Sequence, residues 1–321
     1  MSDAAGRVTG PFPIRPADLA PLNELFSDAF SERYRRDGMS GVRVPPLNPA
    51  IWRFAIESAG EGAMLWRDGL GRIAAFNLAH VSGTEGWMGP LAVREELQGR
   101  GIGRTIVRAA IERLRAAGCR VIGLETMPRT MDNIGFYAGL GFVPGHLTVT
   151  LTLEGTPATD ARPPLLSAHT EAERTAIIAE AAALAGDVKD GSDYSREIAC
   201  TLRHALGDMV LLRDARGALR GFALFHDAPL VEGRSREEIR VLKLVLAETA
   251  AMSAMAEALA AQARRSGALR VAVRVQGEYP AAFRALVARG AHVRWTDLRM
   301  TLTGFDDVPA ATGVVLSNWE I

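Results

Sequence analysis

The sequence has 321 residues, in which 37 lysines and arginines are balanced by 37 aspartates and glutamates. Hydrophobic residues make up 48% and charged residues 23%, a mixture typical of globular proteins. At roughly 150 residues per domain, this length predicts two domains. The balanced charge argues against nucleic acid or an anionic membrane as the main partner.

Only two cysteines occur, Cys119 and Cys200, which excludes a disulfide scaffold and a cysteine-rich zinc site. The histidines lack metal-ligand spacing, so we expect no metal. The first seven residues lack the apolar core of a signal peptide. The apolar stretch 241–263 is interrupted by charges and makes a poor membrane span. We therefore expect a cytoplasmic protein with no membrane partner.

The predicted elements of the first half alternate between short strands and helices. The first helix has Leu22, Leu25, Phe26 and Phe30 on one face. Residues 154–164 are polar and rich in proline, which predicts a linker. In chain order we predict a strand at 13–15, helices around 22–30 and 51–56, strands at 63–67, 72–81 and 87–93, a helix at 101–117, a strand at 120–125, a helix at 133–139 and a strand at 147–153.

The second half repeats this order. The predicted elements are helices at 170–184 and 195–206, strands at 209–213, 220–226 and 239–246, a helix at 251–265, a strand at 269–275, a helix at 281–289 and a strand at 294–302. The halves are also alike in letters: Arg67-Asp68-x-x-Gly71 and Arg213-Asp214-x-x-Gly217 lie 146 positions apart. We predict one fold used twice, with domains over 11–153 and 165–321.

A glycine-rich turn links the strand ending at position 93 to the long helix. Gly99, Gly101 and Gly103 allow backbone angles that other residues resist, and they let a ligand approach the main chain. The helix leaves its first N–H groups unpaired and presents the positive end of its dipole. Together these features predict an anion site suited to a pyrophosphate, to which Arg100 and Arg104 would add charge.

Two familiar phosphate loops fit this turn poorly. For the Walker pattern, Gln98 stands where the first glycine is needed and Arg104 where lysine is needed. The dinucleotide fingerprint is matched at Gly99 and Gly101, but its third glycine is again replaced by Arg104. Glu125 lies at about the distance expected for a ribose contact. An NAD-binding oxidoreductase therefore stays an alternative.

The spacing Gln98-x-x-Gly101-x-Gly103 resembles the acyl-CoA pyrophosphate loop of the GNAT acetyltransferase superfamily. A second motif at 133–142 resembles a later helix of that superfamily, with Asn, then Phe-Tyr, then Gly-Phe. A helix and a strand separate the two motifs, as the family requires. The resemblance covers residues 11–153.

The resemblance implies an α+β (mixed α/β) chain of two tandem GNAT-like folds, each a mixed, mostly antiparallel sheet flanked by helices. It implies an acyl-CoA-dependent N-acyltransferase that moves acetyl from acetyl-CoA to a primary amine of a small molecule or peptide by direct attack. No metal is implied, and a homodimer is a further expectation. A non-catalytic acyl-CoA sensor is the alternative from another class.

The resemblance also assigns roles to residues. The strand before the loop is expected to leave its neighbour at Gly89-Pro90, because proline cannot donate a ladder hydrogen bond. Main-chain groups of Leu91, Ala92 and Val93 would then pair with the pantetheine arm. The phosphates would be held by Gln98, Gly99, Arg100, Gly101, Ile102, Gly103 and Arg104.

On the later helix, Asn133 would contact the arm near its sulfur, and Tyr137 would act as general acid toward the departing thiolate. A phenol with a pKa near 10 keeps its proton at neutral pH. For the base that takes the amine's proton, Glu85, Glu125 and water stay open. The Arg33–Arg36 stretch around Tyr34 either borders the acceptor, where it would suit a carboxylate, or is an exposed charged helix end.

The second half lacks these chemical features. No glycine lies between Gly233 and Gly267, and Glu248 in the place of the loop would repel phosphate. The counterpart of Tyr137 is aligned as Arg284, so the acid is absent. We expect the second copy to be degenerate, without a cofactor loop, and to serve structure or to shape the acceptor site.

Overall fold

The computed structural model describes residues 7–156 and 163–319. The elements of the first half are β1 (Thr9–Pro13), α1 (Leu19–Arg36), α2 (Pro49–Ala59), β2 (Ala63–Arg67), β3 (Ile73–Ser82), β4 (Glu85–Val93), α3 (Ile102–Ala116), β5 (Val121–Thr126), α4 (Met131–Ala138) and β6 (Phe142–Glu154). The first strand lies earlier than predicted, because Pro16 already begins a 3-10 turn.

The elements of the second half are α5 (Glu171–Val188), α6 (Ser195–Arg203), β7 (Gly207–Arg213), β8 (Leu219–His226), β9 (Glu238–Leu246), α7 (Met252–Arg265), β10 (Arg270–Gln276), α8 (Pro280–Ala288), β11 (His292–Leu302) and β12 (Val314–Ser317). They match the predicted order, with β12 as an additional strand. None of the helices in the described ranges is long and apolar enough to cross a membrane.

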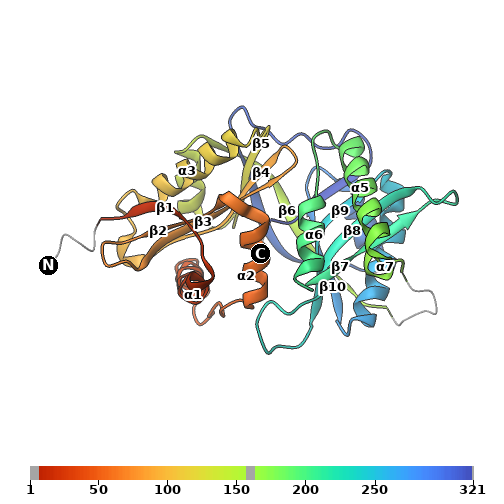
Figure 1. The fold of residues 1–321 in the computed structure, drawn as a ribbon, viewed down its shortest axis with the longest axis horizontal. Coiled ribbons are helices and arrows are strands. Elements are labelled where there is room, and N and C mark those ends of the chain that lie inside the picture. Colours follow the sequence, from red (N-terminus) through yellow and green to blue (C-terminus); the bar gives the residue numbers. More distant parts are fainter. Residues whose placement is uncertain (1–6, 157–162, 320–321) are drawn as a thin grey trace.

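The twelve strands found in the described residues belong to one sheet, ordered β1-β2-β3-β4-β5-β11-β6-β10-β9-β8-β7, with β12 beside β9. Most neighbours are antiparallel, whereas β4 with β5 and β9 with β10 are parallel. In the first half, α3 and α4 pack on one face and α1 and α2 on the other. The second half repeats this with α7 and α8 against α5 and α6 (Figure 1). The α+β fold expected from the sequence is confirmed.

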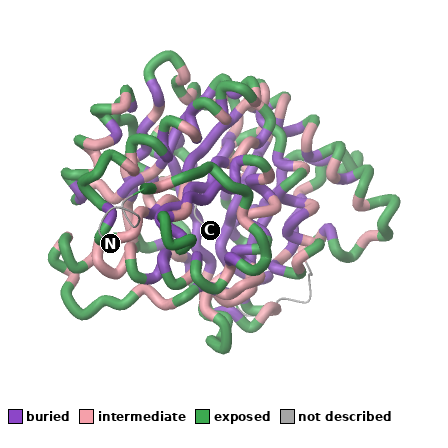
Figure 2. The backbone as a smooth tube through the Cα atoms, turned by 60° about the vertical axis from the view of Figure 1, so that its left-hand side comes forward, coloured by how far each residue is buried: buried purple, intermediate pink, exposed green. Residues whose placement is uncertain are grey.

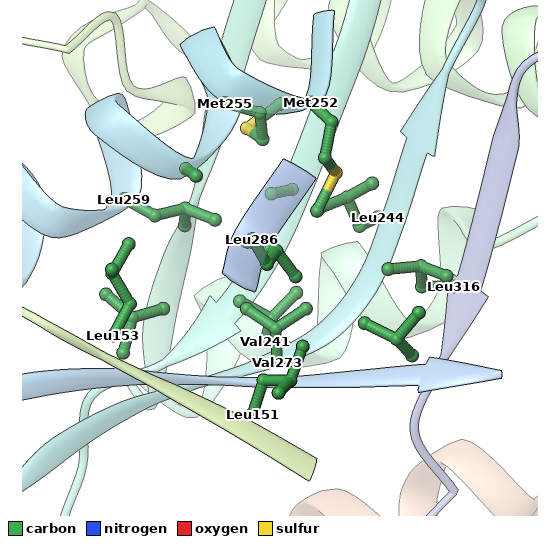
Figure 3. Close-up of a cluster of buried hydrophobic side chains, with 14 of the residues drawn as sticks. Leu151, Leu153, Val241, Leu244, Met252, Met255, Leu259, Val273, Leu286 and Leu316 are labelled. Carbon is green, nitrogen blue, oxygen red and sulfur yellow. The ribbon is translucent and has the colours of Figure 1, made fainter. Parts of the chain in front are cut away.

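The last long strands of the two halves exchange places. The second half's β11 pairs with β5, with Arg299 opposite Glu125, and the first half's β6 lies between β11 and β10. Side chains follow the same exchange. Leu151 and Leu153 of β6 pack in the core beneath α7 and α8 (Figure 3), while Met300 and Leu302 of β11 pack in the core beneath α3. Each half is therefore completed by a strand of the other.

The buried residues follow the strands through the middle of the molecule, and exposed residues gather on helices and loops (Figure 2). The sequence explains this distribution, because strands that helices cover on both faces consist of nearly continuous apolar runs. The run Ile73–Leu78 of β3 is buried at every position. Asn77 within it donates a hydrogen bond from its amide to the Ile106 carbonyl at 3.4 Å.

The repeated Arg-Asp-x-x-Gly motif forms the same turn in both halves. In the β2–β3 hairpin, the Asp68 carboxylate accepts from backbone N–H groups two and four residues further on, at 3.0 and 2.9 Å. In the β7–β8 hairpin, Asp214 does the same at 2.9 and 3.0 Å. The shared letters thus specify the hairpin connection in each half.

The predicted linker at 154–164 begins where β6 ends, at Glu154. Gly155 is still held, because its N–H donates to the Leu269 carbonyl at 2.8 Å and its carbonyl accepts from Arg264 Nε at 2.7 Å. Residues 157–162 of the predicted linker lie outside the described residues.

Candidate active site

The strands β4 and β5 run side by side and then separate. Parallel pairing joins Glu85–Met88 to Val121–Leu124 and, in the described chain, goes no further along β4. At the same place the pairing of β4 with β3 shifts register, between the pairs Asn77–Leu91 and Ala79–Met88. The predicted separation at Gly89-Pro90 is therefore confirmed. The β5 side of Leu91–Val93 offers main-chain hydrogen-bonding groups to whatever fills the gap, except the Val93 carbonyl, which accepts from the Gln98 side chain.

A cavity of about 360 Å³ opens where these strands part. Its walls come from both helices and strands. It is lined by Ala29, Phe30, Glu32, Arg33, Tyr34 and Arg36 of α1, Met88–Val93 of β4, Gln98 and Gly103 after β4, Leu124–Met127 at the end of β5, Asn133, Phe136 and Tyr137 of α4, and Trp295 and Asp297 of β11.

The glycine-rich turn lies beside this cavity and is open. Gly99 has φ +75° and Gly101, the residue that caps α3, has φ +80°, a left-handed conformation that favours glycine. A side-chain carbon at either position would meet nothing within 4 Å. The first bond of α3 runs from the Thr105 N–H to the Gly101 carbonyl, so the preceding N–H groups have no partner within the helix and lie at its positive end.

Gly103 has a packing role in addition. A side-chain carbon there would come within 3.2 Å of the Phe136 ring. The missing side chain lets α4 approach the start of α3, and Arg104 strengthens this contact by donating from Nη1 to the Gly139 carbonyl at 3.2 Å. Gln98 braces the loop from its other end by donating from Nε2 to the Val93 carbonyl at 3.0 Å.

The residues predicted from the two motifs are brought together in space. Of those assigned to the cofactor and to catalysis, the ones that line the cavity are Leu91, Ala92, Val93, Gln98, Gly103, Asn133 and Tyr137. The others form the adjoining turn and the first turn of α3 and do not line it: Gly99, Arg100, Gly101, Ile102 and Arg104.

Tyr137 is buried, with 7% of its surface exposed, between the rings of Phe136 and Phe142 at 5.1 and 6.0 Å. Burial raises the pKa of its phenol well above 10, because the charged phenolate is poorly solvated there. The side chain therefore keeps its proton and can act as a donor. Near it, Asn133 donates from Nδ2 to Thr126 Oγ1 at 3.5 Å.

The two glutamates considered as bases are placed differently. Glu125 lines the cavity, but it accepts from Arg274 Nη2 at 2.6 Å and from Thr148 Oγ1 at 2.5 Å. Burial alone would raise its pKa, yet the charges of Arg274 and Arg299 hold the pKa of Glu125 below its usual value. Glu85 lies outside the cavity lining and is paired with Lys189. Neither carboxylate is a free base.

The charged end of α1 borders the cavity. Arg33, Tyr34 and Arg36 line it, whereas Arg35 turns outward and pairs with Glu32. The end of this helix is tied to α4, because Thr130 Oγ1, in the residue before α4, donates to Asp37 Oδ2 at 2.6 Å.

Cys119 is confirmed as a buried thiol. It is 4% exposed, and burial raises its pKa to about 11. The thiol is thus not activated as a nucleophile. In the described ranges, no group of three or more His, Cys, Asp or Glu side chains is arranged to hold a metal ion.

Trp295 and Asp297 in the cavity wall were not among the residues selected from the sequence. Both belong to β11, more than 150 positions after the glycine turn. The alternation at 294–302 predicted a strand, and no signal in the letters indicated that this strand would lie beside β5.

The corresponding gap in the second half is closed. The parallel pairing of β9 with β10 covers Glu238–Arg240 and Arg270–Ala272 only, so these strands also part. Into the gap enters β12, which pairs along Lys243–Leu246 of β9. It is also fixed to β10, since the Gln276 side chain donates to the Ser317 carbonyl at 2.8 Å and accepts from the Ser317 N–H at 3.3 Å.

The counterpart of Tyr137 in the second half is not Arg284, as the sequence alignment had it. The left-handed glycines Gly118 and Gly141 of the first half match Gly267 and Gly290, an offset of 149 residues. At this offset α4 and α8 begin at equivalent positions, and Tyr137 corresponds to Leu286, which is 1% exposed. The phenol is absent from the second copy by either alignment.

Comparisons with known proteins agree with this geometry. Residues 20–142 match the acetyltransferase (GNAT) family. Over 164 residues, the chain is 28% identical to glucosamine 6-phosphate N-acetyltransferase 1 of Oryza sativa subsp. japonica, covering 46% of this chain and 91% of that protein.

Two solved structures share the fold across both halves. A tandem GNAT protein from the clavulanic acid biosynthesis pathway superimposes with a TM-score of 0.61 at 15% identity, over 92% of this chain and 98% of that one. A GCN5-related N-acetyltransferase from Sphaerobacter thermophilus gives 0.58 at 15% identity, over 92% and 94%. The tandem arrangement is therefore found in a protein of similar length and fold.

Proposed function

Because residues 20–142 match the acetyltransferase (GNAT) family, we propose that this chain transfers an acetyl group from acetyl-CoA to a primary amine of a small-molecule or peptide acceptor. The observation that supports this best is the cavity at the parting of β4 and β5. It joins an unpaired strand edge, a glycine-rich helix start and a buried phenol in one place.

In this proposal the two ends of the cavity bind different parts of the cosubstrate. The N–H groups at Gly101 and the first turn of α3 bind the diphosphate, with Arg100 and Arg104 nearby. The edge of Leu91–Val93 pairs with the pantetheine arm as an added strand would. Asn133 contacts the arm near the sulfur.

The transfer itself is a direct displacement. The amine nitrogen attacks the thioester carbon, a C–N bond forms, the C–S bond breaks, and the amine loses one proton. Tyr137 gives its proton to the departing thiolate sulfur, which is why a phenol kept protonated by burial suits the position. Because both predicted glutamates are held in ion pairs, we assign the amine's proton to water.

One observation favours a second function. Neither Glu85 nor Glu125 is a free base. A site that binds acyl-CoA without turning it over, as a sensor, would have this same geometry. The cytoplasmic location and the homodimer expected from the sequence stay predictions.

Thiol release from acetyl-CoA distinguishes these functions. The purified chain is assayed with glucosamine, glucosamine 6-phosphate, putrescine, phenethylamine and a lysine peptide, and its melting temperature is measured with CoA and with NAD. Amine-dependent release supports the transferase. A melting temperature raised by CoA, with no thiol release for any amine, supports the sensor. A melting temperature raised by NAD alone would favour the NAD-binding oxidoreductase.

A further inference from the structure

The second half contributes part of the cavity wall. Leu298 of β11 is opposite Thr126, the last residue of β5, so the preceding residues of β11 extend past the end of that strand. Asp297 and Trp295 lie there, and both line the cavity. They stand next to the point where β4 and β5 have parted, the place at which the acceptor must arrive under the proposed function.

Asp297 is held firmly in a buried position. Its side chain is 5% exposed, and its Oδ2 lies 2.9 Å from Arg274 Nη2. The same Arg274 nitrogen also binds Glu125, so one guanidinium fixes two cavity carboxylates. The Trp295 indole donates to Asp297 Oδ1 at 3.3 Å.

Stability is a weak reason for such an arrangement. Burying an ion pair costs desolvation energy that the attraction often fails to recover, and apolar replacements are frequently as stable. A carboxylate placed at the wall of a cavity by its own arginine is instead suited to a ligand that donates hydrogen bonds. A primary amine is such a ligand.

Aromatic rings stand across from each other at the same place. The rings of Trp295 and Tyr34 lie 6.4 Å apart at 63°, so that β11 and α1 meet over the cavity. The faces of such rings attract ammonium groups and pack against apolar carbon frames. One wall therefore combines a negative charge with flat apolar surface.

We propose that β11 forms the acceptor-binding wall of the active site. Asp297 accepts a hydrogen bond from the acceptor's primary amine, and Trp295 with Tyr34 packs against the carbon frame that bears it. Arg274 is a positioning residue for Asp297. In this proposal the second half selects the acceptor while the first half binds acyl-CoA, and the inference rests on the proposed acyl transfer.

The test compares two carboxylates of the same buried network. Asp297→Asn removes the charge inside the cavity. Asp307→Asn is the matched control, because Asp307 pairs with Lys189 at 2.6 Å and approaches Arg299 at 3.6 Å without lining the cavity. For the best amine of the panel, we expect Asp297→Asn to raise the amine KM about 10- to 100-fold and leave the acetyl-CoA KM within twofold. The control should change neither KM.

An equal rise in amine KM for both variants would show a structural role and overturn the proposal, as would an unchanged amine KM in Asp297→Asn. Partial recovery in Asp297→Glu supports it. If Asp297→Asn does not fold, Trp295→Ala replaces it, with the same KM split expected at about tenfold.

If the wild-type chain transfers acetyl to none of the amines, the proposed function has failed, and the wall is tested by binding. The same amines are titrated calorimetrically into protein saturated with CoA. Amine binding that is lost in Asp297→Asn and kept in Asp307→Asn supports the wall. No binding of any amine to the wild-type chain overturns it.

Discussion

The first half leaves a gap between β4 and β5, and the second half fills the same gap between β9 and β10. In both halves the parallel pair separates after a few residues. In addition, β4 shifts register against β3, and β9 shifts register against β8. In the second half β12 takes the place, and Leu316 joins the core there (Figure 3). Gly313 makes this entry possible, since a side-chain carbon there would lie 2.3 Å from the Leu246 carbonyl.

This difference agrees with the proposed binding of a cosubstrate in the first gap. Backbone groups at a parted strand edge need partners, and the second copy supplies them from its own chain. The connection after β9, residues 247–251, is shorter than residues 94–101 after β4 and contains no glycine. The second half, which lacks the glycine-rich loop, has its gap filled by β12. The first half, which contains the loop, has its gap open.

The largest expected effect is a loss of CoA binding when a negative side chain is placed in the glycine-rich loop. Gly101→Glu places a negative side chain at the start of α3, where a diphosphate would meet the N–H groups. We expect CoA binding, measured calorimetrically at one CoA per wild-type chain, to weaken by about 100-fold or more. Gly118→Glu is the matched control, because Gly118 has a similar φ of +76° in open space at the other end of α3. Equal CoA affinity in both variants would remove the loop from the cofactor site.

Removing the phenol tests the other feature that the second copy lacks. Tyr137→Phe is expected to lower kcat about 100-fold with little change in the acetyl-CoA KM, because the proton donor is lost and the ring still packs. Steady-state kinetics with the best amine measures this. Leu286 shows that an apolar residue fits the equivalent position. An unchanged kcat would exclude Tyr137 as the acid.

The exchanged strand allows the independence of the halves to be tested. Leu151 belongs to the first half but lies 1% exposed in the second half's core. We expect Leu151→Ala to lower the free energy of unfolding by about 2–5 kcal/mol in one cooperative transition, followed by denaturant titration. Leu147→Ala, on the same strand and 42% exposed, should change it by less than about 0.5 kcal/mol. Two separate transitions would show that the halves unfold independently.

The smallest expected effect is an absence of change with pH. The acid must be protonated to act, and burial raises the pKa of Tyr137 well above 10. Deprotonation of this group should therefore not lower kcat as pH rises from 7 to 9.5. A fall in wild-type kcat that is missing from the residual activity of Tyr137→Phe would contradict the assigned pKa direction.

Local sequence predicted well which residues gather where β4 and β5 part. Gly89-Pro90, the glycine turn and Asn133-to-Tyr137 each specify their own stretch of backbone, and all of them flank the same two adjacent strands. The motif spacing of a family is enough to predict the positions of such residues, because segments that are close in the chain also lie close together in the sheet.

The part of the cavity wall that comes from β11 could not be predicted in this way. Asp297 and Trp295 reach the cavity only because β11 lies between β5 and β6, and sheet order over such separations is set by packing of the whole chain. β12 was missed because Val314–Ser317 is too short for a periodic pattern. The alignment of Arg284 with Tyr137 failed because the connections between matching elements differ in length.

The exchange of β6 and β11 has a consequence for the history of such a chain. After a gene duplication, a copy that loses its chemistry is ordinarily free to be deleted. Here a deletion after β6 would remove β11, which pairs with β5. It would also remove the Met300 side chain from the core of the first half. Loss of the second half would therefore also damage the sheet and the core of the first half.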